Sequence, residues 1–357
     1  MKTRLAILAL LLPAALFAQK ASDYTFTTVK ENPITAPKDQ YESGTCWCHA
    51  TTALLESEAI RINNITDPAK YPDFSELYTV YRAYQDRAVK YLRVNGHLTS
   101  GPGSLGGDLL HIVKEWGIVP QSAMPGKTEL PQLRGMDKEI AAYLKGIIED
   151  KEKLKTDWKK GLDKILTNTM GACPETFLVD GVAYNPAGYR DHYCINPDNY
   201  ITLTSFTHHP FYEEFAIEVP DNWRWDEAWN ITLDELLRTV YYAIDNGFTV
   251  AWGMDLSEPG WTWDGLAVTK VKEVTQESRQ YDFDVQNTVD DHLMLIYGTA
   301  LDQNGNKFFK VKNSAGADAG AFKGIWYASE PYFLGKTLYM TLHRDAIPAD
   351  IRAKLGL

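Results

Sequence analysis

A cysteine at the start of a helix-forming run is the side chain best placed for chemistry in this sequence of 357 residues. The polar segment 40–45 leads to Cys46, and residues 46–62 are then rich in Ala, Leu, Glu and Ile. Unpaired backbone N–H groups and the helix dipole at such a position favour a thiolate. The dipole contributes about 1 kcal/mol, whereas lowering a thiol pKa from about 8.5 to about 4 needs roughly 6 kcal/mol. We therefore expect a histidine from elsewhere in the chain to pair with Cys46.

The residues around Cys46 resemble a known signature. Gln40 followed by Ser43-Gly44-Thr45-Cys46-Trp47 is similar to the motif of papain-like cysteine peptidases. Further stretches resemble the bleomycin hydrolase / aminopeptidase C branch and occur in the same order along residues 38–353. They are Gly106-Gly107 leading into a helix that ends in Trp116-Gly117-Ile118-Val119-Pro120, then Pro174-Glu175-Thr176-Phe177, and Trp252-Gly253-Met254-Asp255. The resemblance implies a peptide-hydrolysing enzyme, and we expect no cofactor.

The same resemblance implies a role for each site residue. Cys46 is the nucleophile, His292 is the general base, and Asn313 orients the imidazole of His292. Gln40 and the backbone N–H of Cys46 stabilise the oxyanion. The pair Gly106-Gly107 lets the substrate backbone approach one wall of the cleft. These are the catalytic and substrate-binding residues that we expect.

The residues between His292 and Asn313 support their pairing independently of the resemblance. Apolar, strand-like runs at 293–297 and 308–312 flank Gln303-Asn304-Gly305-Asn306, which is a strong hairpin turn signal. Folding at this turn brings His292 and Asn313 to the same open end of the hairpin. One side chain can then hold the orientation of the other.

The elements that must position these residues change in character along the chain. Helices are predicted at 46–62, 75–94, 108–116 and 233–246, and residues 135–170 should form two helices broken near Lys159-Lys160-Gly161. Strands are predicted at 249–252, 293–297, 308–312, 325–327 and 338–342, whereas residues 20–39 look irregular and extended. We expect an α+β, papain-like two-lobed fold. Its parts are a helical lobe at about 40–125, a helical insertion at about 127–172 and an antiparallel, β-barrel-like lobe at about 230–345.

The first residues predict export. Two basic residues, an apolar run at 5–17 broken by Pro13, and the small residue Ala18 have the form of a secretory signal peptide over residues 1–18. The run is too short for the roughly 20 residues that span a bilayer. We therefore expect a peptidase domain over residues 19–357 that is secreted or periplasmic, with no membrane span in the mature chain.

Composition restricts the partners. The formal net charge of -11 argues against a nucleic-acid binder, which needs a basic face to replace phosphate counterions. No pair of carboxylates in a recognisable setting indicates a glycosidase. Peptide or protein substrates are the expected partners, and a homo-oligomer is possible but not assumed.

Other reactive side chains have simpler interpretations. His49 lies on the same helix as Cys46 and should point along the helix surface rather than across a cleft. His208-His209 lie in a loop without catalytic context, and the segment 46–49 lacks the ligand spacing of a haem or zinc motif. We therefore expect no metal.

The remaining cysteines and the tryptophans are interpreted as structural. Cys48 should be a small core residue, and Cys173 and Cys194 are either a disulfide or two free thiols. A tryptophan-rich region comprises Trp223, Trp225, Trp229, Trp261 and Trp263. Such clusters can line sugar- or peptide-binding grooves, but packing is the commoner explanation.

Two positions depart from the family pattern. Ala315 stands where relatives usually have a tryptophan that shields the Asn–His hydrogen bond, and Trp326 is a candidate to fill the gap. Residues 343–357 resemble the family only up to its penultimate helix, without the terminal arm that restricts relatives to exopeptidase action. We expect an exported Cys-His-Asn peptidase, an aminopeptidase or, with a short arm, an endopeptidase. The alternative is a peptidase-fold protein that binds peptides and hydrolyses them weakly or not at all.

Overall fold

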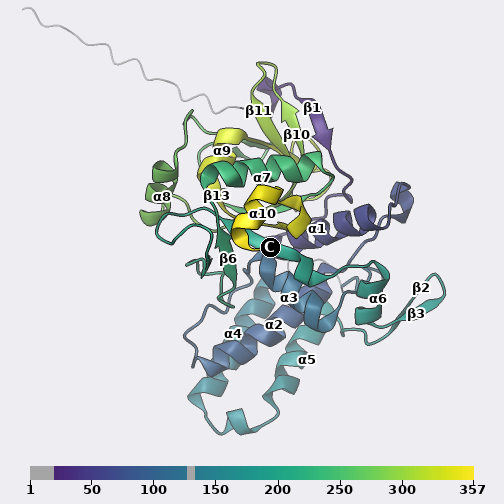
Figure 1. Cartoon of the computed structure of the whole chain (residues 1–357). Coiled ribbons are helices and arrows are strands. Elements are labelled where there is room, and N and C mark those ends of the chain that lie inside the picture. The colour runs from purple at the N-terminus through teal and green to yellow at the C-terminus, as the bar shows by residue number, and fades with distance from the viewer. Residues whose placement is uncertain (1–19, 127–132) are drawn as a thin grey trace, which may run out of the picture.

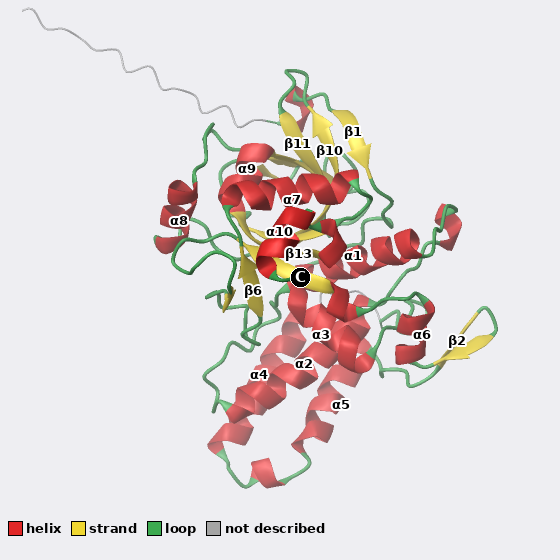
Figure 2. Cartoon of the chain, in the orientation of Figure 1, coloured by secondary structure: helices red, strands yellow, loops and turns green. Residues whose placement is uncertain are grey.

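The computed structural model describes residues 20–126 and 133–357, so the predicted signal peptide at 1–18 lies outside the described residues. Figure 1 shows a bundle of helices in the lower part of the molecule and a large sheet with its own covering helices in the upper part. Figure 2 shows the same division by colour. The predicted α+β class is confirmed. No helix in the described ranges is long and apolar enough to cross a bilayer.

Most helices begin and end close to where the sequence predicts them. Those of the lower part are α1 (Cys46–Ile62), α2 (Glu76–Arg93), α3 (Gly106–Trp116), α4 (Leu133–Glu149), α5 (Trp158–Met170) and α6 (Pro186–His192). The helix α1 is buried on nearly all sides, because it packs against α2 and α3 and also against the strands β7 (Val250–Met254) and β10 (His292–Leu301). It therefore joins the helical part to the sheet.

The helical insertion corrects one prediction. Residues 150–157, and not Lys159-Lys160-Gly161, separate α4 from α5. Gly161 suggests a break in the sequence, but in the structure it lies inside α5, where a Cβ would overlap the ring of Tyr143 on α4. The glycine lets the two helices approach closely, and apolar residues such as Leu144 and Leu166 are buried between the helices and α2.

One mixed sheet forms most of the upper part. Its strand order is β5-β6-β4-β13-β7-β10-β11-β12-β9-β8, and β1 (Thr27–Glu31) pairs with β10. The other bounds are β4 (Tyr200–Thr204), β5 (Glu214–Ala216), β6 (Glu227–Asn230), β8 (Trp261–Thr262), β9 (Leu266–Ala267), β11 (Lys307–Lys312), β12 (Ile325–Ser329) and β13 (Thr337–His343). A separate hairpin consists of β2 (Phe177–Val179) and β3 (Val182–Tyr184). The strand β1 lies in the segment that the sequence analysis expected to be irregular.

The hairpin of β10 and β11 forms as predicted. Its strands are antiparallel, with Leu301 opposite Lys307 next to the turn. In the turn, Oδ1 of Asp302 accepts hydrogen bonds from the backbone N–H groups of Asn304 and Asn306, each at 2.8 Å. Gly305 has φ +80°, a left-handed conformation that a glycine adopts without strain. The open end of this hairpin points toward α1.

Helices cover the sheet, and the last of them lies near the C-terminus of the chain. They are α7 (Leu233–Asp245), α8 (Gln276–Asp284), α9 (Glu330–Lys336) and α10 (Ala349–Leu355). In Figure 1 the yellow helix α10 lies beside α7. Ion pairs join them, with Nζ of Lys354 2.6 Å from Glu235 and the Arg238 guanidinium 3.1 Å from Asp350. The buried side chains of Ile351 and Leu355 belong to the core of the sheet.

Candidate active site

Cys46 is the first residue of α1, at the junction of the helices and the sheet. The carbonyl of Thr45 accepts hydrogen bonds from the N–H groups of Cys48 and His49, which starts the helix. Gly44 has φ +67°, and a Cβ there would overlap Pro102. The indole Nε1 of Trp47 donates to the carbonyl of Pro102 at 2.9 Å. The chain before Cys46 is thus packed against the loop that precedes α3.

His292 and Asn313 meet at the open end of the β10–β11 hairpin. Their Nε2 and Oδ1 atoms are 2.8 Å apart. An amide oxygen only accepts hydrogen bonds, so Nε2 of His292 carries the proton and Nδ1 is the free acceptor. Oδ1 of Asn313 also accepts from the N–H of Ser314, and the Asn313 side chain is buried. The orientation of the imidazole is therefore fixed by a residue that is itself held in place.

Gln40 is anchored to the same region. Its backbone N–H donates to the carbonyl of Ser314, and its Oε1 accepts from the Ser314 hydroxyl at 2.5 Å. With Oε1 engaged, the donor that Gln40 offers is its Nε2 group. The bridge between Asp39 and Ala315 continues this pairing. Ala315 therefore has a backbone role in fastening the segment before Cys46.

A cavity of about 270 Å³ lies where the segment of Gln40, the start of α1 and the open end of the β10–β11 hairpin meet. Its lining includes Gln40, Cys46 and His292. Of the glycines near α3, Gly101 and Gly103 line this cavity, whereas Gly106 and Gly107 do not. The reason is that both of the expected wall glycines already belong to α3, where a Cβ on Gly106 would touch Thr51 and Thr341 and Gly107 faces Asp226. The loop before α3, and not Gly106-Gly107, therefore lines the cavity of Cys46.

A pair of stacked tryptophans lies next to the imidazole of His292. The ring of Trp261 lies edge-on to His292, with centroids 6.2 Å apart, and stacks on Trp326 at 5.8 Å. Nε1 of Trp326 donates to the carbonyl of Thr262. The sequence analysis named Trp326 as a replacement for the tryptophan missing at Ala315, but the residue that contacts His292 is Trp261. The tryptophan-rich composition was the available signal, for which packing was considered the commoner explanation.

The thiol and the imidazole are both shifted toward their neutral forms. Burial raises the pKa of Cys46 to about 12, opposed by a hydrogen bond from the Leu293 backbone and reinforced by Asp290 and Asp221. Burial lowers the pKa of His292 to about 4, and its hydrogen bond to Asn313 opposes this shift. Burial and the neighbouring carboxylates therefore do not favour the helix-terminal thiolate expected from the sequence. A proton passed from Cys46 to His292 would create both charges together.

Three carboxylates share the cavity with Cys46. Asp221, Asp290 and Asp291 all line it. Both carboxylate oxygens of Asp291 accept a hydrogen bond, one from the Leu256 backbone N–H and one from the Ser257 hydroxyl. Oδ2 of Asp290 is buried and has no hydrogen-bond partner among the described residues. Burial raises the pKa of Asp290 well above its usual value, and Asp221 and Asp291 add to the shift.

The sequence analysis missed these carboxylates as functional groups. Asp290 and Asp291 directly precede His292, which was an available signal. Asp221 comes from a loop between β5 and β6, and nothing in its local sequence places it near Cys46. Its carboxylate lies so close to Gly103 that a Cβ there would overlap it.

The other candidate residues lie elsewhere. His49 contacts the Thr45 carbonyl at 3.0 Å and does not line the cavity of Cys46. Cys48 is fully buried, as predicted. Cys173 and Cys194 are free thiols, which decides the open alternative against a disulfide.

The chain is similar to known peptidases. A model of the peptidase C1-like family matches residues 11–356. Aminopeptidase C of Listeria monocytogenes serovar 1/2a (strain ATCC BAA-679 / EGD-e) is 22% identical over an alignment of 362 positions, which covers 88% of this chain and 81% of that protein. The crystal structure of PepW from Lactobacillus rhamnosis HN001 matches with a TM-score of 0.76 at 18% identity, over 92% of this chain and 84% of that one. This likeness confirms the predicted papain-like fold.

Proposed function

The chain belongs to the peptidase C1-like family and is a papain-like cysteine peptidase, and we propose that it acts as an exported aminopeptidase with a Cys46–His292–Asn313 triad. The observation that carries the triad is the 2.8 Å hydrogen bond between His292 and Asn313 beside the cavity of Cys46. The bond leaves Nδ1 of His292 free to take the thiol proton. Nucleophile, base and orienting residue are then supplied by three separate elements.

The reaction follows from these positions. Sγ of Cys46 attacks the scissile carbonyl carbon while its proton passes to Nδ1 of His292. Nε2 of Gln40 and the backbone N–H of Cys46 donate to the oxyanion. His292 then gives its proton to the leaving amine as the C–N bond breaks. Water attacks the thioester, His292 takes a proton from it, and the carboxylic acid leaves as Cys46 regains a proton.

The charge of the cavity supports the aminopeptidase specificity. A substrate with a free N-terminus brings an ammonium group, and Asp290 has an unpartnered buried oxygen that can accept a hydrogen bond from it. Arg87 opposes the raised pKa of Asp221. Oδ2 of Asp290 has no hydrogen-bond partner among the described residues, so Asp290 is the acceptor that we assign to the ammonium group.

Binding of the ammonium also activates the thiol. Asp290 and Asp221 both raise the pKa of Cys46. A positive charge bound beside them cancels this part of the shift, because opposite charges about 4 Å apart attract by roughly 4 kcal/mol at an effective dielectric of about 20. The substrate class that fits is peptides with a free N-terminus. Such a substrate therefore favours the thiolate of Cys46 beyond what His292 alone provides.

The contact between Trp261 and His292 favours hydrolysis over the alternative of a weak or inactive peptide binder. That alternative rests on Ala315, because loss of the family tryptophan would expose the Asn–His hydrogen bond to water. The edge of Trp261 lies against the same imidazole and supplies an apolar cover. The shielding is thus provided from β8 instead of from the loop after Asn313.

Labelling with an epoxysuccinyl reagent near pH 6, followed by peptide mapping, tests the triad. We expect rapid modification of Cys46 and little of Cys194, which is an exposed free thiol and serves as an internal reference. His292→Ala should remove this selectivity. Equal labelling of both thiols in the parent protein would refute the assignment of Cys46 as an activated nucleophile.

A further inference from the structure

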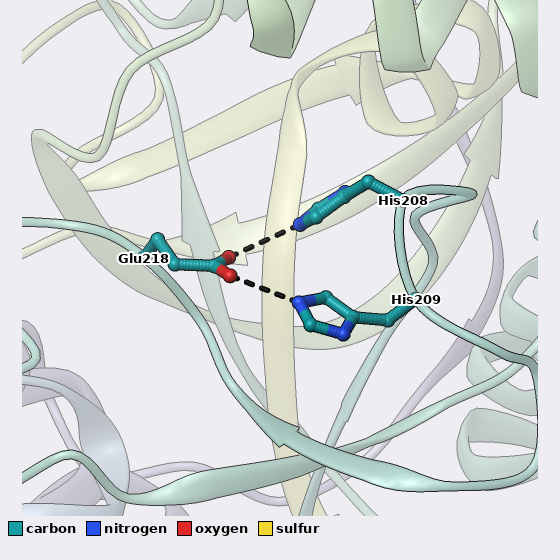
Figure 3. A group of neighbouring side chains, drawn as sticks. All are labelled: His208, His209 and Glu218. Atoms are coloured by element: carbon teal, nitrogen blue, oxygen red, sulfur yellow. Dashed lines mark hydrogen bonds and ion pairs between the residues drawn. The ribbon is translucent and has the colours of Figure 1, made fainter.

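Three side chains outside the catalytic cavity converge on one point (Figure 3). His208 and His209 lie between β4 and β5, and Glu218 follows β5. Nε2 of His208 is 3.0 Å from Oε2 of Glu218, and Nε2 of His209 is 2.9 Å from Oε1. One candidate ligand atom from each residue lies within 4.8 Å of the others. Two imidazole nitrogens and a carboxylate are the ligand types that zinc prefers.

The two rings are held in place by their neighbours. The ring of His209 stacks on Phe215 with centroids 4.1 Å apart, and that of His208 lies parallel to Phe283 at 5.7 Å. Oε1 of Gln280 lies 3.4 Å from Nδ1 of His208, where it can accept the ring proton. A polar partner on the second ring nitrogen is what orients a metal-bound histidine. Both Nε2 atoms are therefore directed toward Glu218 before any ion arrives.

The spacing of the ligand atoms also suits a divalent ion. Zinc bonds of about 2.0–2.2 Å in a tetrahedron put ligand atoms roughly 3.3 Å apart. The observed separations of 2.9 and 3.0 Å need only a small opening to admit the ion. Three protein ligands leave a fourth position for water.

We propose that His208, His209 and Glu218 bind a zinc ion that fastens the chain after β5 to the loop after β4. These residues do not line the cavity of Cys46, so the ion takes no direct part in the proposed peptidase reaction. This site departs from the sequence expectation of a metal-free protein. That expectation considered His208-His209 alone, without the glutamate that the fold brings to them.

The ion would steady a segment that matters for the substrate. Asp221 lies in the same stretch as Glu218 and reaches the catalytic cavity. Beyond it, Nδ2 of Asn222 donates to the carbonyls of Ile217 and Asp226, both at 3.0 Å. The segment is thus braced by its own hydrogen bonds on one side and by the ion on the other.

Equilibrium dialysis against Zn²⁺ alone tests the site. The protein is the Cys46→Ala variant, stripped with a chelator, because the thiol and His292 could otherwise bind zinc themselves. We expect one zinc per chain by mass spectrometry, and binding about 100-fold weaker in His208→Ala and in His209→Ala. His97→Ala, which removes an exposed histidine outside the cluster, is the matched control and should bind as the parent does.

Cobalt provides a second readout. Co²⁺ in place of zinc should give the visible absorption of a tetrahedral site in the parent and lose it in Glu218→Gln, a variant of nearly unchanged shape. Circular dichroism checks that each variant is folded. If the alanine variants do not fold, the loss of metal binding in Glu218→Gln is the deciding test. Failure of the parent to bind zinc more tightly than about 0.1 mM, or full binding by the Glu218→Gln and histidine variants, would overturn the proposal. The cluster would then be a pair of hydrogen bonds to one carboxylate.

Discussion

Substitution of Asp290 by asparagine should make the protein more stable and a poorer aminopeptidase. Oδ2 of Asp290 is buried without a partner, and burial raises its pKa well above the usual value. A buried charged group without a partner costs about 1–3 kcal/mol or more. Asp290→Asn keeps the shape and removes the charge. The free energy of unfolding at neutral pH should therefore rise by about 1–3 kcal/mol.

The gain in stability should depend on pH. A raised pKa means that the folded state holds the proton of Asp290 more tightly than the unfolded state does. The stability from this proton is fully present below the unfolded pKa of about 3.9 and is lost as pH rises through the folded value. Asp290→Asn has no carboxyl group to titrate at this position, so the variant does not lose this stability as pH rises. The difference in urea midpoint between variant and parent should be small at pH 4 and grow toward pH 8.

The activity of the same variant should fall only for substrates with a free N-terminus. A hydrogen bond between the substrate ammonium and a carboxylate is worth about 1.5–3 kcal/mol, which corresponds to about 10- to 150-fold in kcat/KM. An N-acetylated form of the same peptide should lose much less. Asp318→Asn removes an exposed charge outside the cavity and is the control for net charge. An equal loss for free and acetylated peptides, or a loss of stability, would refute the reasoning.

Three further predictions follow from the site. Gln40→Ala should lower kcat by about 100- to 1,000-fold through loss of an oxyanion donor, and parental activity would remove Gln40 from the mechanism. Trp261→Ala should lower kcat/KM by about 2- to 10-fold, because water then competes for the 2.8 Å His292–Asn313 hydrogen bond, worth about 0.5–1.5 kcal/mol. Trp261→Phe should restore most of it, and a loss confined to stability would contradict the shielding role. If the chain is exported as proposed, N-terminal sequencing of the mature protein should begin at Gln19, whereas an intact Met1 would contradict the signal peptide.

Features encoded close together in the sequence were predictable. The bounds of α1 agree with the predicted 46–62, because an unbroken run of helix formers begins at a polar loop and ends at Asn63. The His292–Asn313 pair was predictable because a short, strong turn separates the two strands that carry it. In both cases the residues that determine the structure lie within about twenty positions of one another in the sequence.

Features that depend on contacts between distant segments were not predictable. Asp221 and Trp261 reach the site only through packing of loops against elements from other parts of the chain. The strand β1 has every residue exposed and no alternating pattern, so only its pairing with β10 identifies it. Gly161 was interpreted as a helix break, although its small size serves the contact with Tyr143.

The order of the catalytic elements along the chain determines when the site comes into existence. Cys46 opens the first long helix, whereas His292 begins β10, and residues 47–291 separate them. At about 5–20 residues per second, synthesis of that interval takes roughly 12–50 s. During this time the growing chain carries a thiol without a base to accept its proton. The hairpin that supplies the base also supplies the partner strand for β1, so sheet closure and peptidase activity arise in one late step.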